Sequence, residues 1–196
     1  MAKFLLVLSF FLIQYQTGNW NFKMDKNGVK VYTKLDDGSS IKYFKGITQV
    51  NASASEVVAM IKNYERYPEW VDAVSSARVI KRESDTTYYI HLKVKLPFPV
   101  SDRDIVQRIE INQLSDTTYY IGIHTVAGYI PEEKGFIRMT LSDGHWNITQ
   151  IKDHETEVEL VSINDPGGSI PKWIVNMMVT DSPYKALRNM RSIFAN

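Results

Sequence analysis

Cysteine is absent from this chain of 196 residues. That absence excludes disulfides, zinc sites built on thiolates, iron–sulfur clusters and thiol nucleophiles. An excess of charge is absent as well, because 23 Lys and Arg residues stand against 22 Asp and Glu residues, and the basic residues form no run. Since nucleic-acid binding relies on concentrated positive charge, we expect no nucleic-acid partner.

The familiar catalytic motifs are also missing. The sequence contains no G-x-S-x-G elbow, no phosphate-binding P-loop, no G-x-G-x-x-G and no H-E-x-x-H. None of the four histidines lies four residues from another: His91, His124, His145 and His154. Asp102 and Asp104 can be interpreted as a pair of catalytic carboxylates, but such residues beside a Pro-rich turn more often tie loops to strand ends. We therefore expect no catalytic residue, no metal site and no cofactor.

Only one long apolar run occurs, and it lies at the N-terminus. Phe4 to Ile13 is apolar except for Ser9 and follows the basic Lys3. A membrane-spanning helix needs about 20 such residues, so this run is too short. It matches a secretory signal, although no A-x-A cleavage pattern follows. The sequence thus predicts a signal peptide at 1–18, a single domain at 19–196, and export to a periplasm or the medium. An uncleaved anchor or a buried first helix is the alternative.

The rest of the chain is rich in segments that alternate with the period of a β-strand. The clearest is Thr86 to Leu96, in which every second residue from Tyr88 is apolar. The turns between these segments are short, which is typical of an antiparallel meander. We expect strands at Val29–Thr33, Lys42–Val50, Ser76–Glu83, Thr86–Leu96, Ile105–Leu114, Thr118–Thr125, Gly135–Leu141, His145–Ile151 and Thr156–Ile163.

Helical patterns occur at three places. Ser53 and Glu56 form a capping box at the start of one short helix, and Pro68 begins a second. A long terminal helix is expected from Pro171, with a kink at Pro183. One long helix on a curved antiparallel sheet is an α+β arrangement, and the space between the two layers is a favourable place for a ligand.

The alternation also predicts which side chains face that space. We expect the apolar face of the strands to form the lining: Ile90, Leu92, Val94, Ile109, Ile121, Ile123, Trp146, Val158 and Leu160. In the strand Thr118–Thr125 the alternative face, with Tyr120 and His124, competes with the one that contains Ile121 and Ile123.

Three segments resemble the START family, the lipid-transfer domains related to the steroidogenic acute regulatory protein. The segment 99–106, PVSDRDIV, is similar to the family's S-x-R-D-[FI]-V stretch. The segment 129–138, YIPEEKGFIR, is similar to its P-x-x-K-G-x-[IV]-R stretch, and 165–173, DPGGSIPKW, looks like its entry into the C-terminal helix. The resemblance runs in order from Trp20 to Asn196.

The resemblance implies a helix-grip fold, in which a curved sheet closes with the C-terminal helix around a hydrophobic tunnel for one lipid. The loop containing Tyr129 would then cover the tunnel mouth. The terminal helix would be a lid that presents Trp173, Ile174, Met177 and Met178 to the lipid. Some family members hold an acid–base pair in the tunnel, but the face with Ile90, Leu92 and Val94 offers no acid. The ligand is therefore expected to be more uniformly apolar.

Three functions remain open from the sequence. The first is non-catalytic binding and transfer of a hydrophobic small molecule by a monomer in transient contact with membranes. The second is an enzyme of the related cyclase and aromatase group, which would need a polar residue in the tunnel: Tyr88, His124, Arg138 or Asp181. The third is a structural domain whose hollow is filled by its own side chains.

Overall fold

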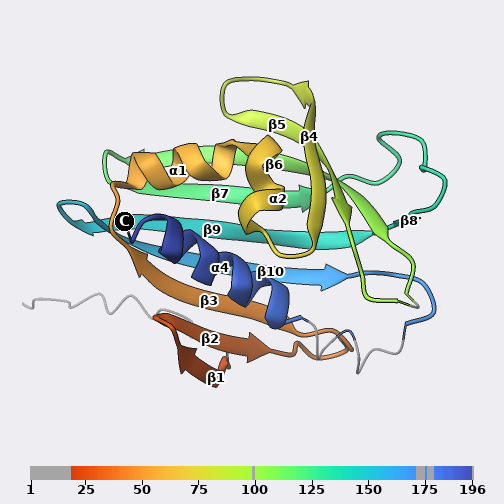
Figure 1. Cartoon of the computed structure of the whole chain (residues 1–196), viewed down its shortest axis with the longest axis horizontal. Coiled ribbons are helices and arrows are strands. Elements are labelled where there is room, and N and C mark those ends of the chain that lie inside the picture. The colour runs from red at the N-terminus through yellow and green to blue at the C-terminus, as the bar shows by residue number, and fades with distance from the viewer. Residues whose placement is uncertain (1–18, 99, 171–174, 176–178, 196) are drawn as a thin grey trace, which may run out of the picture.

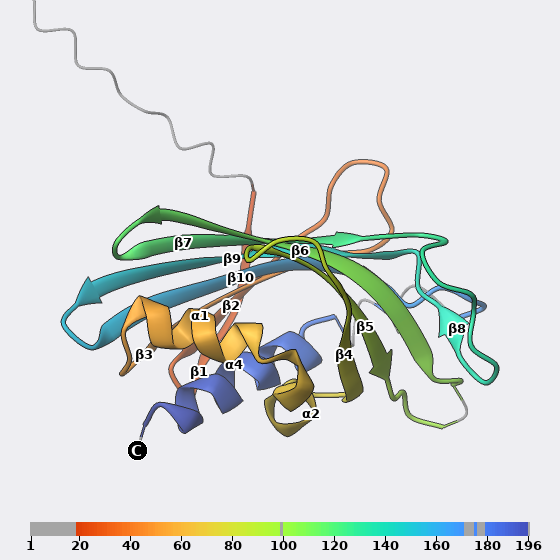
Figure 2. The same cartoon turned by 90° about the horizontal axis from the view of Figure 1, so that it is seen from above.

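A computed structural model of the protein describes residues 19–98, 100–170, 175 and 179–195. This part of the chain forms one ten-stranded sheet that curves strongly (Figures 1 and 2). The strands are β1 (Asn21–Lys26), β2 (Val29–Lys34), β3 (Tyr43–Val50), β4 (Val74–Arg82), β5 (Thr87–Val94), β6 (Arg103–Ser115), β7 (Thr118–Thr125), β8 (Ile137–Arg138), β9 (Leu141–Lys152) and β10 (Glu155–Asp165).

The strand order is β1-β2-β3-β10-β9-β7-β6-β5-β4, and all of these neighbours are antiparallel. Only the short β8 lies off this path, where it pairs in parallel with the start of β6. Neighbours along the chain are mostly neighbours in the sheet, as the short turns of the sequence predicted. The main exception is the connection from β3 through the helices to β4 at the far edge, and the pairing of β3 with β10 brings the N-terminal and C-terminal parts of the sheet together.

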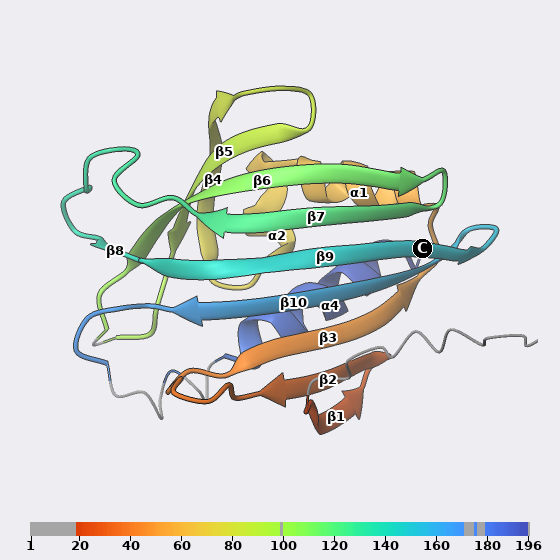
Figure 3. The same cartoon turned by 180° about the vertical axis from the view of Figure 1, so that it is seen from behind.

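The helices lie against one face of the sheet, and the opposite face carries none in the described chain (Figures 2 and 3). They are α1 (Ala54–Lys62), the 3-10 turn η1 (Tyr64–Arg66), α2 (Tyr67–Trp70) and α4 (Asp181–Ile193). The predicted capping box of α1 is present, since Ser53 and Glu56 bond to each other's backbone N–H groups. The α+β prediction, with a curved antiparallel sheet gripping a C-terminal helix, is confirmed.

Helix α4 begins at Asp181, later than the start predicted at Pro171. Pro183 therefore stands in the first turn of α4, where a missing N–H removes no helical hydrogen bond. Residues 171–174 and 176–178 lie outside the described residues, so the placement predicted for Trp173, Ile174, Met177 and Met178 is not described. The N–H of Val179 donates to the carbonyl of Val175 at 2.9 Å.

Helix α4 lies close over β3 because β3 carries Gly46 at the crossing. A Cβ atom added to Gly46 would lie 2.3 Å from Cδ1 of Leu187, which is closer than real side chains approach. Leu187 itself is fully buried. The glycine therefore fixes how near the helix comes to the sheet.

Two strand predictions need correction. Of the strand expected at Gly135–Leu141, only Ile137 and Arg138 form β8, since Gly135 has a positive φ of 94°, which is not extended backbone. Leu141 already belongs to β9. Strand β1 was not predicted, since its burial does not alternate and it pairs only with β2 at the sheet edge. None of the helices in the described part of the chain is long and apolar enough to cross a membrane.

Candidate ligand-binding site

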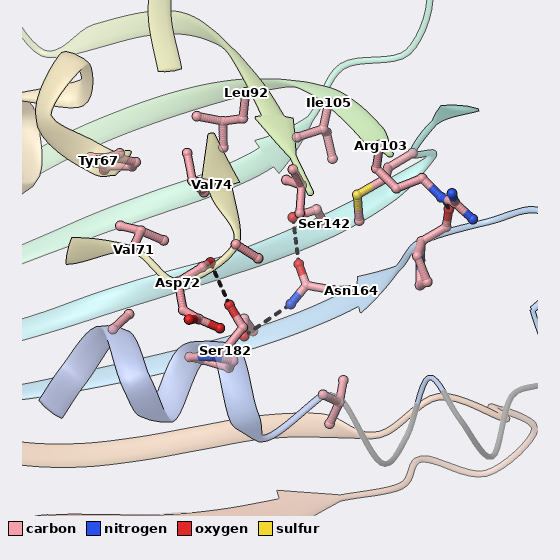
Figure 4. A pocket seen from close by; sticks show the side chains of 18 of the residues that line it. Tyr67, Val71, Asp72, Val74, Leu92, Arg103, Ile105, Ser142, Asn164 and Ser182 are labelled. Carbon is pink, nitrogen blue, oxygen red and sulfur yellow. Dashed lines mark hydrogen bonds between the residues drawn. The ribbon is translucent and has the colours of Figure 1, made fainter. Parts of the chain in front are cut away.

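A pocket of about 570 Å³ lies between the concave face of the sheet and the elements that cover it (Figure 4). Its walls come from β5, β6, β7, β9 and β10, and from α2, the segment after α2, the loop between β5 and β6, and the N-terminal turns of α4. Most of the lining side chains are apolar. The elements that meet here are far apart in the sequence, so only the folded sheet assembles the pocket.

Seven of the side chains predicted from strand alternation lie in the wall of this pocket: Ile90, Leu92, Val94, Ile109, Ile123, Trp146 and Leu160. They come from five neighbouring strands of the sheet, β5, β6, β7, β9 and β10. Alternation therefore identified the concave face of each strand. Whether these residues bind a ligand stays a prediction.

Ile121 and Val158 lie on the same face but outside the pocket wall. Both are fully buried in the hydrophobic core, in the cluster that contains Val57 and Ile61 of α1. Helix α1 contacts β7 and β9 near this end of the sheet and fills the space there. The alternation of a strand shows on which face a side chain lies. It does not show where along the strand a helix, and not the pocket, covers that face.

Tyr129 also lies outside the pocket wall, and this corrects the expectation that its loop covers the mouth. Its ring stacks on the ring of Tyr89, with ring centroids 4.5 Å apart. Because Tyr89 and Ile90 are successive residues of β5, Tyr129 lies on the opposite face of the sheet from Ile90. In the same loop, Glu133 forms an ion pair with Lys93 at 2.5 Å. The loop between β7 and β8 therefore folds onto the convex face of β5.

A buried triad of His91, Asp104 and Arg138 holds this loop. Arg138 donates from Nε and Nη2 to the two carboxylate oxygens of Asp104 at 2.9 and 2.8 Å, and His91 Nε2 lies 2.8 Å from the same carboxylate. Asp104 is fully buried. Burial alone would raise the pKa of its carboxyl, but the hydrogen bonds and charges of Arg138 and His91 outweigh this, so its pKa lies below the usual range. Arg138 also donates to the carbonyls of Ile130 and Pro131. The triad is a structural clasp on the convex face.

Arg103 belongs to the pocket wall but is only 1% exposed. Its guanidinium donates to the carbonyl of Pro166 at 2.5 Å, to that of Gly167 at 3.1 Å and to that of Ser101. Burial lowers its pKa. Arg103 thus connects the start of β6 to the chain that follows β10, and its N–H groups are largely committed to backbone oxygens.

The N-terminal half of α4 is tied to the segment that follows α2. Ser182 donates from Oγ to the carbonyl of Asp72 at 2.9 Å, as Figure 4 shows, and Lys185 lies 3.3 Å from the carboxylate of Asp72. Asn189 donates to the carbonyl of Trp70 at 3.0 Å. These contacts hold α4 across the pocket.

Four neutral polar side chains in the wall were missed by sequence reasoning, and we call them the polar row: Gln107, Ser142, Ser162 and Asn164. Gln107 stands midway between Ile105 and Ile109, so the alternation that placed Ile109 also points to it. Asn164 lies one residue beyond the predicted end of its strand. Sequence reasoning missed the polar row because it took polar residues on an apolar face as interruptions of the pattern.

Of the four polar residues that an enzyme could use, only Asp181 lies in the wall, and it is exposed. Tyr88 donates its hydroxyl to the carbonyl of Asp85, and His124 faces Glu110 on the convex side. Arg138 is part of the buried triad. Among the described residues, no group of three or more His, Asp or Glu side chains could hold a metal ion.

The family assignment follows from comparison with known proteins. A family model described as "START domain" matches residues 9–196, nearly the whole chain. This chain belongs to the START domain family. The resemblance of the three sequence segments is thereby confirmed.

Relatives of known sequence and structure agree with this assignment. An uncharacterized protein of Pseudomonas aeruginosa is 32% identical over 174 residues, which cover 89% of this chain and 86% of the relative. The mouse phosphatidylcholine transfer protein is 24% identical over 178 residues, with 88% and 82% covered. The crystal structure of a STAR-related lipid transfer protein fragment from Xanthomonas axonopodis superimposes with a TM-score of 0.83 at 29% identity, over 90% of this chain and 99% of that one. START-family membership and this fold support lipid binding.

Proposed function

We propose that this chain binds one lipid molecule in the pocket and carries it between membranes without converting it. The observation that carries the proposal is the pocket, about 570 Å³ of mostly apolar space in a START domain. Pockets of roughly 300–1,000 Å³ suit small organic ligands. Burial of apolar ligand surface would supply the affinity, at about 25 cal/mol per Å².

Two observations favour carriage over catalysis. First, the candidate polar residues Tyr88, His124 and Arg138 lie outside the pocket wall. Second, similar proteins carry names that describe lipid transfer, such as the phosphatidylcholine transfer protein of the mouse. Catalysis needs a reactive group that touches the substrate, and of the four candidates only the exposed Asp181 lies in the wall.

The proposal also concerns the localisation and the oligomeric state of the protein. Residues 1–18 would direct the chain out of the cytoplasm, because Phe4 to Ile13 has the length of a signal-peptide core. The carrier would act as a monomer, since one chain forms the whole pocket wall.

Lipid loading from vesicles tests the binding proposal. The purified chain is mixed with vesicles made from the total lipid extract of its source organism, and the vesicles are then removed by size exclusion. We expect about one lipid per chain in the protein fraction, measured by mass spectrometry, because the pocket of about 570 Å³ has room for one such ligand. A protein fraction without lipid after prolonged mixing contradicts the proposal.

The loop between β5 and β6 is the part of the pocket that we propose to touch the membrane. Leu96, Pro97 and Val100 line the pocket, while Phe98 in the same loop is 97% exposed. A fully exposed aromatic ring beside an apolar pocket is suited to insertion among lipid headgroups. A lipid could then pass into the pocket without crossing water.

Replacing Phe98 with serine is expected to slow lipid loading about tenfold and to leave the final occupancy unchanged. The ring is worth about 1.5–3 kcal/mol when buried, and each 1.4 kcal/mol is a factor of ten in membrane binding. Loading is followed over time with the same vesicles. The matched control is Phe22→Ser, because Phe22 is 58% exposed on β1, outside the pocket wall. Equal loading rates for wild type and Phe98→Ser would rule out this contact.

A further inference from the structure

The polar row crosses an otherwise apolar wall and is linked by hydrogen bonds. Gln107 Nε2 donates to the hydroxyl and the carbonyl of Ser142, both at 2.9 Å. The Ser142 hydroxyl donates to Asn164 Oδ1 at 2.6 Å (Figure 4). Asn164 Nδ2 lies 3.5 Å from the Ser162 hydroxyl. The residues come from β6, β9 and β10, so the row spans the middle of the sheet.

These bonds use only part of what the row can form. Within the described chain, Gln107 Oε1, the Ser162 hydroxyl hydrogen and the second N–H of Asn164 Nδ2 have no side-chain or backbone partner. A primary amide offers two donors and an acceptor with two lone pairs. Polar groups inside proteins are normally satisfied by a partner. The row therefore presents spare neutral donors and acceptors in the pocket wall.

The charged side chains of the pocket wall are less available than the polar row for binding a ligand. Arg103 is 1% exposed and holds backbone carbonyls, and Asp143 Oδ1 accepts from the N–H and the hydroxyl of Thr125, both at 2.7 Å. Asp72 is paired with Lys185, and Lys95 and Asp181 are exposed. Lys95 also follows the end of β5, whereas Gln107 pairs with Ile90, farther along that strand. A charged headgroup beside the polar row would lose its hydration without gaining an opposite charge, which is unfavourable.

We propose that the bound lipid carries an uncharged hydroxyl or carbonyl group that forms hydrogen bonds with Gln107, Ser162 and Asn164. The proposal rests on the lipid-binding function above and narrows its ligand to a neutral polar lipid. A phosphate or carboxylate headgroup does not fit this arrangement. The expectation of a uniformly apolar ligand changes accordingly, because the pocket wall has a polar centre.

The first test identifies the lipid that wild-type protein takes from vesicles of total lipid extract. A neutral lipid with a hydroxyl or carbonyl head, enriched over its share in the vesicles, supports the proposal. A phospholipid or a fatty acid as the main bound species overturns it, while lipid binding itself stands. A chain that takes up no lipid overturns the proposed function and this inference together.

The second test changes the row and uses defined ligands. We expect Asn164→Leu to weaken binding of 1-oleoylglycerol about tenfold, since Leu keeps the side-chain volume but cannot form hydrogen bonds. Binding of an uncharged hydrocarbon dye such as 1,6-diphenyl-1,3,5-hexatriene should stay within twofold of wild type, which shows that the pocket remains open. Wild type should also prefer 1-oleoylglycerol to 1-oleoyl-lysophosphatidic acid, which has the same acyl chain and a phosphate.

The matched control is Asn147→Leu, the same substitution on the convex side of β9, where Asn147 bonds to Glu159 at 2.7 Å. It should bind 1-oleoylglycerol as wild type does. Gln107→Leu is a second variant of the row and should behave like Asn164→Leu. Unchanged binding of 1-oleoylglycerol by both row variants, or a wild-type preference for the phosphate, overturns the proposal.

Discussion

Replacing Ile123 with tryptophan is expected to reduce lipid occupancy at least tenfold and to leave the protein folded. Ile123 lies in the centre of the pocket wall on β7, opposite Ile109 of β6, and is only half-buried because it faces the pocket. An indole ring there would occupy space that the lipid needs. Overpacking costs about 1–3 kcal/mol, and each 1.4 kcal/mol is a factor of ten in affinity.

Occupancy is measured by mass spectrometry after loading from vesicles, and folding is measured by thermal unfolding. The control is His124→Trp at the next position of the strand, where the side chain is 53% exposed on the convex face. It should load lipid as wild type does. If Ile123→Trp bound lipid at the wild-type level, the pocket described here would not be the binding site.

Replacing Arg138 with methionine is expected to destabilise the protein by about 3–5 kcal/mol. The change leaves the carboxylate of Asp104 fully buried with only His91 beside it, and an uncompensated buried charge carries a cost of this size. Urea unfolding at pH 7 measures it. Arg66→Met is the control. Arg66 and Glu69 form a solvent-exposed ion pair, so the loss of stability in this variant should be far smaller. Equal stability of Arg138→Met and wild type would show that the clasp contributes little.

The same triad predicts how stability depends on pH. The folded-state pKa of Asp104 lies below its unfolded value, which is about 3.9. Its contribution is therefore fully present above about pH 4 and is lost as the pH falls toward the folded pKa. Unfolding free energies measured from pH 7 to pH 2.5 should fall less steeply below pH 4 in Asp104→Asn than in wild type. An identical slope would contradict the lowered pKa.

Alternation predicted the sheet well because the period of a strand is a local property. In β5 it placed Ile90, Leu92 and Val94 on the pocket side and His91 on the other. The second face carries polar residues, yet His91 on it is only 2% exposed. The cover comes from the loop between β7 and β8, more than 35 residues further along the chain, and a local pattern contains no information about it.

The pocket itself depends on contacts that no local pattern specifies. Ile121 and Ile123 have the same period in β7, yet one lies beneath α1 and the other lines the pocket. The polar row needs three strands in register before its side chains can meet, with Asn164 opposite Ser142. The Tyr129 loop was assigned to the wrong side because its sequence does not show which face of the sheet it follows.

Native mass spectrometry of the wild-type chain, purified gently from its own host, tests the central claim most directly. We expect the main species to be the protein with one bound lipid, released on collisional activation and absent from Ile123→Trp prepared in the same way. A wild-type protein that is empty when isolated, and stays empty after mixing with vesicles of total lipid extract, would contradict the account.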